Sequence, residues 1–117
     1  MLSRDDIQKL LDRMAKVYTA GDAAGCAAMF TENAQLHSPF GPPAVGRRAI
    51  YHLHEEWVAD SGTKVFSILD FGSTDSLGWC LCRFSEDGVE EGTSLLVLEQ
   101  QSDGIWLIRS CCLHGDA

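Results

Sequence analysis

The sequence predicts one α+β domain, residues 1–117, in which three N-terminal helices cover one face of a curved antiparallel sheet. Three observations lead to this class. The chain has 117 residues, which is the length of a single domain. Apolar residues recur at helical spacing in most of the first 60 positions. Apolar segments of strand length, separated by turn motifs, make up the remainder.

Two helices are expected before residue 31. Ser3 and Asp6 have the spacing of a capping box, with Asp in place of the usual Glu or Gln, and apolar residues at helical spacing follow them. Gly21 is expected to end this first helix, because glycine readily adopts the left-handed conformation found there. Asp22 can then cap a short second helix that runs through Phe30.

A short strand and a third helix are expected next. The strand covers residues 33–38, and residues 36–46 contain all three prolines of the chain. The pattern alone leaves open whether this proline segment is a linker or the edge of a pocket. The helix is expected in residues 46–60, where His54 takes a place on the apolar face that an apolar residue would normally fill. The rest of that face consists of Ile50, Leu53, Trp57 and Val58.

Four strands are expected at residues 63–72, 77–85, 93–101 and 105–114, because the turn motifs STDS, EDG and SDG separate them. These strands are apolar on both sides, whereas an antiparallel sheet in a monomer usually has one polar face. The predicted outer face carries Trp79, Leu81, Leu95, Val97, Trp106 and Ile108. We expect a homodimer through this outer sheet face, since a second copy of the chain is the simplest cover.

The charge of the chain limits its partners. The formal net charge is −8, and Arg47 and Arg48 are the only adjacent pair of basic residues. This charge repels nucleic acid and anionic membrane surfaces, so we expect neither as a partner. The polar N-terminal segment does not have the pattern of a signal peptide, and no apolar run approaches the length of a membrane span. We therefore expect a soluble, cytoplasmic protein.

The chain has five cysteines, and an odd number without a secretory signal favours reduced thiols. The pairs in CLC and CC do not predict a zinc site. Neighbouring residues on a strand point to opposite faces, and the strand between the two segments would hold the pairs apart. We expect buried cysteines that act as small apolar side chains, and no metal or organic cofactor.

The segments GDAAGCAAMFTENAQLHSPFGPPAVGRRAI and DGIWLIRSCCLHG resemble the nuclear transport factor 2-like superfamily, which includes ketosteroid isomerases and SnoaL-like polyketide cyclases. The order of elements matches over nearly the whole chain. This resemblance implies a cone-shaped, cystatin-like fold around a pocket for a small molecule. It also implies that the proline segment is the rim of that pocket.

The resemblance further implies that the catalytic groups of ketosteroid isomerases are absent. Their general-base Asp precedes the proline of the rim segment, where this chain has Ser38. Their oxyanion Tyr, supporting Tyr and oxyanion Asp fall on Met14, Phe30 and Leu96. We therefore expect no steroid isomerase activity by that mechanism, since none of these four side chains is an acid or base near neutral pH.

His54 is the candidate catalytic residue, because an imidazole titrates near neutral pH and can act as a general acid or base. Alternatively, it is a buried ring that bonds a backbone carbonyl or Tyr18. Arg109 also has two interpretations. It either faces the cavity and binds a carboxylate of the ligand, or lies at an edge beside an acid such as Glu99.

The remaining candidates for contact with a ligand are Tyr18, Ser38, Trp57, Cys80, Cys82 and Cys111. Together these residues predict a small-molecule pocket protein. It would be a cofactor-independent isomerase, cyclase or dehydratase acting on a small hydrophobic or anionic, for example carboxylate-bearing, substrate. The alternative is a non-catalytic ligand-binding or dimerisation module of the same fold, because fold alone does not determine function.

Overall fold

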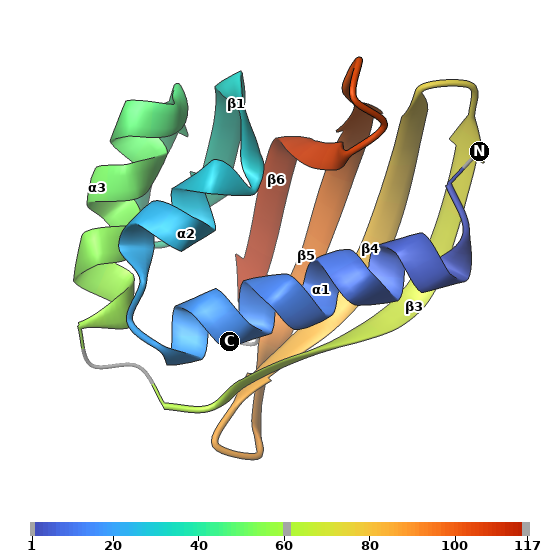
Figure 1. Ribbon diagram of the computed structural model, residues 1–117. Helices are drawn as coiled ribbons and strands as arrows, with labels where there is room; N and C mark the ends of the chain where they lie inside the picture. Colours follow the sequence, from blue (N-terminus) through green and yellow to red (C-terminus); the bar gives the residue numbers. More distant parts are fainter. Residues whose placement is uncertain (1, 60–61, 116–117) are drawn as a thin grey trace.

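The structure, a computed structural model, describes residues 2–59 and 62–115. Within these residues the predicted α+β class is confirmed, with three helices and one six-stranded sheet (Figure 1). The elements are α1 (Arg4–Thr19), α2 (Ala23–Ala28), β1 (Phe30–Ser38), β2 (Gly41–Val45), α3 (Arg47–Val58), β3 (Lys64–Thr74), β4 (Leu77–Glu86), β5 (Val89–Gln100) and β6 (Trp106–Gly115). Residue 60, the expected end of the third helix, lies outside the described residues.

The predicted caps of the first two helices are confirmed. The hydroxyl of Ser3 accepts a hydrogen bond from the Asp6 amide at 3.1 Å, and the Asp6 carboxylate accepts one from the Ser3 amide at 2.9 Å. Asp22 accepts a hydrogen bond from the Gly25 amide at 2.9 Å and caps α2. The helix α2 ends at Ala28, earlier than expected, because Phe30 already belongs to β1. No helix in the described part of the chain is long and apolar enough to cross a membrane.

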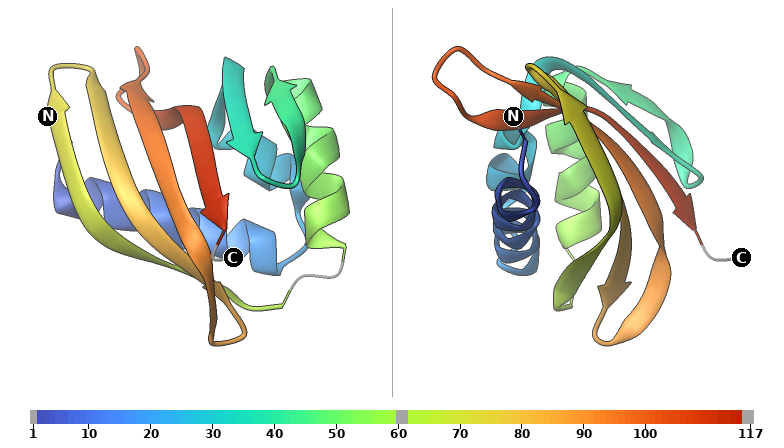
Figure 2. Two further views of the ribbon diagram at one scale, coloured as in Figure 1. Left: turned by 180° about the vertical axis from the view of Figure 1, so that it is seen from behind. Right: turned by 90° about the vertical axis from the view of Figure 1, so that its right-hand side faces the viewer.

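The sheet has the strand order β2-β1-β6-β5-β4-β3. Four of its five strand pairs are antiparallel, but β1 and β6 are parallel, so the expected antiparallel sheet is mixed. The strands β3 to β6 form a meander that starts at the far edge and ends beside β1. Figure 1 shows α1 crossing β3, β4 and β5, with α2 and α3 near β1. The strands curve around the helices, and no helix covers their outer face (Figure 2).

The proline segment forms a β-hairpin at one edge of the sheet. After Ser38 the chain turns and returns as β2, which pairs with β1 so that Leu36 lies opposite Ala44. The Arg47 guanidinium at the start of α3 donates two hydrogen bonds to the Phe30 carbonyl, at 3.1 and 2.7 Å. The segment is therefore not a slack linker, since both of its ends are bonded to β1.

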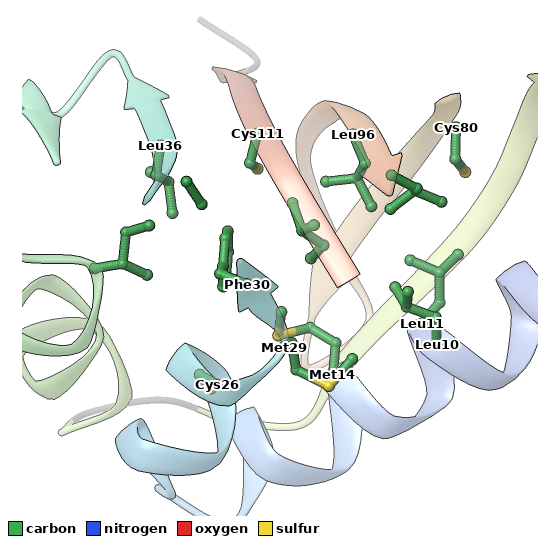
Figure 3. Close-up of a cluster of buried hydrophobic side chains, with 14 of the residues drawn as sticks. Leu10, Leu11, Met14, Cys26, Met29, Phe30, Leu36, Cys80, Leu96 and Cys111 are labelled. Carbon is green, nitrogen blue, oxygen red and sulfur yellow. The ribbon is translucent and has the colours of Figure 1, made fainter. Parts of the chain in front are cut away.

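The core lies between the helices and the inner face of the sheet (Figure 3). Leu11 and Met14 of α1 point towards the sheet, and Leu96 and Cys111 of β5 and β6 point back towards the helices. All four side chains are buried, and burial of one large apolar side chain contributes about 1.5–3 kcal/mol. The packing of this one cluster positions α1 over the sheet.

A β-bulge in β6 changes which of its side chains face inward. Ile108 lies opposite Leu98 and Ser110 lies opposite Val97, so Arg109 is the extra residue. As a result, Ile108 and Cys111 are both buried although they are three residues apart. The expected outward position of Ile108 is therefore wrong. Trp106, two residues before Ile108, was also expected on the outer face and instead packs against the core.

The outer face of the sheet remains apolar and exposed. Trp79 is 39% exposed and Leu95 is 43% exposed, and their neighbours Leu81 and Val97 are half-buried. Trp79 lies over Gly72 of the adjacent strand, where a Cβ atom would be only 2.7 Å from the indole nitrogen. The prediction that both faces of these strands are apolar is confirmed for this part of the sheet.

Candidate functional site

A cavity of about 660 Å³ lies between α1, α3 and the inner face of the sheet. Most of its wall is apolar, with side chains from both helices and from every strand except β2. Polar groups are few and come from separate elements: Tyr18, His54, Lys64, Ser94 and three glutamates, at 86, 90 and 91, near the β4–β5 turn. A largely apolar wall with a few polar groups is typical of small-molecule sites.

His54 lies in the wall of this cavity and is only 3% exposed. Its Nδ1 is 2.8 Å from the carbonyl oxygen of Ile50, one turn earlier in α3. A carbonyl oxygen can only accept, so Nδ1 carries the proton and Nε2 of the neutral ring keeps its lone pair. The predicted backbone hydrogen bond is confirmed. It does not exclude a chemical role, because it occupies only one of the two ring nitrogens.

The surroundings of His54 favour the neutral ring. Burial lowers the pKa of His54 below its ordinary value of 6.5. The hydrogen bond to Ile50 opposes this shift, and the positive charge of Lys64 adds to it. The imidazole is therefore a base with an available lone pair at neutral pH.

Three aromatic rings surround the imidazole. The ring centroids of Trp57, Phe30 and Tyr18 lie 5.3, 5.8 and 6.2 Å from that of His54. The Tyr18 hydroxyl donates a hydrogen bond to the Trp57 carbonyl at 3.5 Å. Burial, together with the negative charge of Glu86, raises the pKa of Tyr18, so its phenol stays protonated. Tyr18, Trp57 and His54 thus line one cavity, as predicted from the sequence.

Lys64 is a residue of the cavity wall that the sequence analysis did not identify. Its side chain is 11% exposed, and its Nζ lies 3.1 Å from the Glu91 carboxylate. The same ammonium lies over two rings, 4.6 Å from the centroid of Tyr18 and 4.9 Å from that of Phe84. Strand alternation was the available signal, because Lys64 shares the inward side of β3 with Phe66.

Arg109 does not line the cavity. Its guanidinium lies 3.5 Å from the Glu99 carboxylate, and its side chain is 55% exposed. The bulge in β6 is the reason, because Ile108 and Cys111 both face inward and the extra residue Arg109 has no partner on β5. Of the two interpretations, the pairing with Glu99 is confirmed and the cavity position is wrong, although β6 is an inner strand rather than an edge of the sheet.

Ser38 also lies outside the cavity wall, since its hydroxyl accepts a hydrogen bond from the amide of Phe40 at 3.3 Å. Leu36 of the same segment does line the cavity, and Phe40 reaches it from the turn of the hairpin. Its ring packs edge-on against Trp57, with the centroids 6.3 Å apart, although Phe40 is 67% exposed. The hairpin therefore contributes an apolar side chain to the rim, rather than the expected hydroxyl.

Two of the three candidate cysteines, Cys82 and Cys111, line the cavity, and Cys80 is buried without lining it. Burial raises the pKa of Cys111 to about 12. The hydrogen bond that the Cys82 thiol donates to Cys80, together with burial, raises the pKa of Cys82. The thiols of Cys82 and Cys111 therefore stay protonated and are poor nucleophiles at neutral pH.

The cavity is apolar where ketosteroid isomerases are expected to have their catalytic groups. Met14, Phe30 and Leu96, the positions that the resemblance assigned to those groups, all line the cavity with buried side chains. No group of three or more His, Cys, Asp or Glu side chains that could hold a metal ion occurs in residues 2–59 and 62–115. The polar chemistry of the wall therefore depends on His54, Tyr18, Lys64 and their neighbours.

Residues 11–94 match the family model described as the SnoaL-like domain. The chain belongs to the SnoaL-like family. The resemblance to the nuclear transport factor 2-like superfamily is confirmed by this match and by the folds of similar structures. Among curated proteins, none matches this SnoaL-like chain.

Several solved structures are similar to the SnoaL-like chain. A protein of unknown function from Mycobacterium tuberculosis is 21% identical with a TM-score of 0.81, over 95% of this chain and 70% of that one. A ketosteroid isomerase-like protein from Erwinia carotovora atroseptica is 16% identical with a TM-score of 0.78, over 97% and 95%. ActVI-ORFA from Streptomyces coelicolor is 23% identical with a TM-score of 0.68, over 96% of both chains. At these identities the similarity establishes the fold alone.

Proposed function

We propose that this SnoaL-like chain binds a small, mainly apolar molecule in its cavity and transfers a proton on that molecule, with His54 as the base. The observation that carries this proposal is the 2.8 Å contact between His54 Nδ1 and the Ile50 carbonyl oxygen. Nδ1 donates to this carbonyl in a ring that lines the cavity, which leaves Nε2 as a proton acceptor. No metal or organic cofactor is needed for such a step.

The reaction class follows from what one neutral imidazole can do. Nε2 takes a proton from a carbon next to a carbonyl, and the electron pair of the C–H bond forms the C=C bond of an enolate. The carbonyl π electrons move to its oxygen. Return of the proton to a different carbon gives an isomer, and transfer to a leaving hydroxyl releases water. Carbonyl-assisted isomerisation, cyclisation and dehydration can each start with this step.

A non-catalytic ligand-binding protein is the second candidate. It is favoured by the apolar side chains of Met14, Phe30 and Leu96 at the positions where ketosteroid isomerases have their catalytic groups. In that case His54 would only stabilise α3 and shape the cavity. The two candidates share the cavity and differ in whether a bound ketone loses a proton.

Hydrogen–deuterium exchange separates these candidates without knowledge of the natural substrate. The probe is 2-acetylnaphthalene, whose methyl hydrogens next to the ketone exchange through an enolate. In deuterated buffer we expect the protein to accelerate the loss of the methyl signal in proton NMR spectra. The His54→Asn variant should lose this acceleration. His52→Asn is the matched control, because His52 lies on the same helix but is exposed and bonded to Glu55.

The outcomes distinguish the two candidates. Binding and exchange that both depend on His54 support the enzyme. Binding of the ketone without accelerated exchange supports the non-catalytic protein. If neither 2-acetylnaphthalene nor naphthalene binds, the cavity is not a site for such molecules and both candidates fail.

A homodimer through the outer sheet face is a separate proposal. It is supported by the exposed apolar side chains of Trp79, Leu95 and Leu77, which lie on the strands without a helical cover. Light scattering at micromolar concentration is the test, with Trp79→Glu as the variant expected to dissociate the dimer. A monomeric wild-type protein would refute this proposal and would leave the cavity proposal unaffected.

A further inference from the structure

Lys64 is the strongest unassigned feature of the cavity. Among the described residues that line it, Lys64 is the only lysine or arginine. Its side chain is 11% exposed, although a lysine is rarely buried unless it is paired. We propose that the Lys64 ammonium donates a hydrogen bond to a neutral carbonyl or hydroxyl oxygen of the ligand. This inference rests on the proposed function and adds to it the chemical class of the ligand.

The geometry keeps Lys64 in place and still leaves it a donor. An ammonium group has three N–H donors, and Glu91 accepts one of them at 3.1 Å. The rings of Tyr18 and Phe84 attract the positive charge but offer the ammonium no carbonyl or carboxylate oxygen. The Lys64 amide also donates to the Thr19 hydroxyl at 3.1 Å, which ties the start of β3 to the end of α1. A ligand oxygen in the cavity can therefore use an N–H group that is already fixed in position.

The charges around Lys64 favour a neutral ligand over an anion. Glu91 already balances the ammonium charge, and Glu86 and Glu90 also line the cavity. Arg83 pairs with Glu90 through hydrogen bonds from its guanidinium. A carboxylate on the ligand would therefore meet a surplus of negative charge. An inward Arg109 would have favoured such an anion, but Arg109 does not line the cavity.

Tyr18 connects Lys64 to the proposed base. The Lys64 Nζ lies 4.6 Å from the Tyr18 ring centroid, and the His54 ring is edge-on to the same Tyr18 ring with the centroids 6.2 Å apart. A ketone whose oxygen bonds Lys64 would therefore extend past Tyr18 towards His54. When a proton leaves the neighbouring carbon, negative charge develops on that oxygen, and a nearby ammonium stabilises it more than it stabilises the ground state.

Four naphthalenes of nearly equal shape test the inference by direct binding. They are naphthalene itself, the ketone 2-acetylnaphthalene, the carboxylate 2-naphthoate and the ammonium 2-naphthylmethylamine. We expect the ketone to bind about tenfold more tightly than naphthalene, as one hydrogen bond to a charged group provides. The carboxylate and the ammonium should both bind more weakly than the ketone. Competition with a fluorescent apolar probe, or quenching of tryptophan fluorescence, measures all four.

Three variants assign the effect to Lys64. Lys64→Met should remove the preference for the ketone over naphthalene, whereas Lys64→Arg should keep the preference. Lys16→Met is the matched control, since it removes the same charge from an exposed position on α1. Glu91→Gln provides a test that does not depend on the folding of Lys64→Met. It should strengthen the binding of 2-naphthoate relative to the ketone, because it removes the charge that balances Lys64.

Each outcome supports or overturns the inference. A ketone preference that Lys64→Met abolishes supports it. Equal binding of naphthalene and the ketone, or strongest binding of the carboxylate or the ammonium, overturns it and leaves the cavity proposal standing. Failure of all four probes, naphthalene included, overturns the proposed function and this inference together.

Discussion

Three leucines of β5 provide a direct test of the cavity, because they share one strand and differ in their surroundings. Leu98 is fully buried in the core and does not line the cavity. Leu96 is 5% exposed and lines the cavity, and Leu95 is 43% exposed on the outer face. Truncation of each leucine to alanine removes the same atoms. Differences between the three losses of unfolding free energy therefore reflect the different surroundings of the side chains.

The structure predicts a definite order for these losses. Leu98→Ala removes three buried carbons and leaves an enclosed void, which costs about 3–4 kcal/mol. Leu96→Ala removes the same carbons beside space that is already open, so only the transfer component of about 2 kcal/mol is lost. Leu95→Ala should cost about 1 kcal/mol in the monomer, because nearly half of its side chain is exposed.

Urea unfolding followed by tryptophan fluorescence measures these differences, with the slope of the transition checked for constancy across the variants. Dilute protein should be used for Leu95→Ala. A dimer through the outer face would bury this side chain, so the loss of unfolding free energy would increase with protein concentration. The reasoning is refuted if Leu96→Ala costs as much as Leu98→Ala, since that result means that no open space adjoins Leu96.

Three further predictions follow from single residues. The folded protein holds the pKa of His54 below its ordinary value, so the unfolded chain binds more protons as the pH falls through 6.5. The free energy of unfolding should therefore fall below that pH, and more steeply in wild type than in His54→Asn; parallel pH profiles in a denaturant titration would contradict this. Arg109→Ala should leave the dissociation constant of 2-acetylnaphthalene unchanged, because its guanidinium bonds Glu99 outside the cavity; a weakened complex would place Arg109 at the ligand. Gly92→Ala should cost about 2 kcal/mol or more in thermal unfolding, since the new Cβ would overlap the His114 carbonyl of β6; an unchanged melting temperature would show that these strands separate locally.

The elements could be predicted from local chemistry. The capping box of Ser3 and Asp6 and the Asp22 cap depend on residues three apart, so the sequence alone reveals them. The end of α2 was placed too late because a parallel partner recruits Phe30 into β1, and that partner, β6, lies far along the chain. Such long-range pairing leaves no local signal.

The site was predicted less completely than the fold. His54 was found because it interrupts an apolar face, and the structure places it in the cavity wall. Arg109 was misplaced because strict alternation fails where a strand has a bulge, and the turn motifs around β6 do not show the extra residue. Lys64 was overlooked because a lysine side chain at the start of a strand is normally expected to be exposed to solvent. The packing of Tyr18 and Phe84 against its ammonium shows that it is enclosed.

The two edges of the sheet differ in their ability to accept another strand. The edge strand β2 contains Pro42 and Pro43, and proline has no amide hydrogen to offer an incoming backbone. Successive backbone amides of an edge strand point alternately towards the sheet and away from it. Because the two prolines are adjacent, one of them always takes a position where an amide would point away from the sheet. Continuous strand-by-strand growth of folded copies needs both edges of every copy, so the proline-containing edge disfavours such growth even though the opposite edge strand, β3, has no proline.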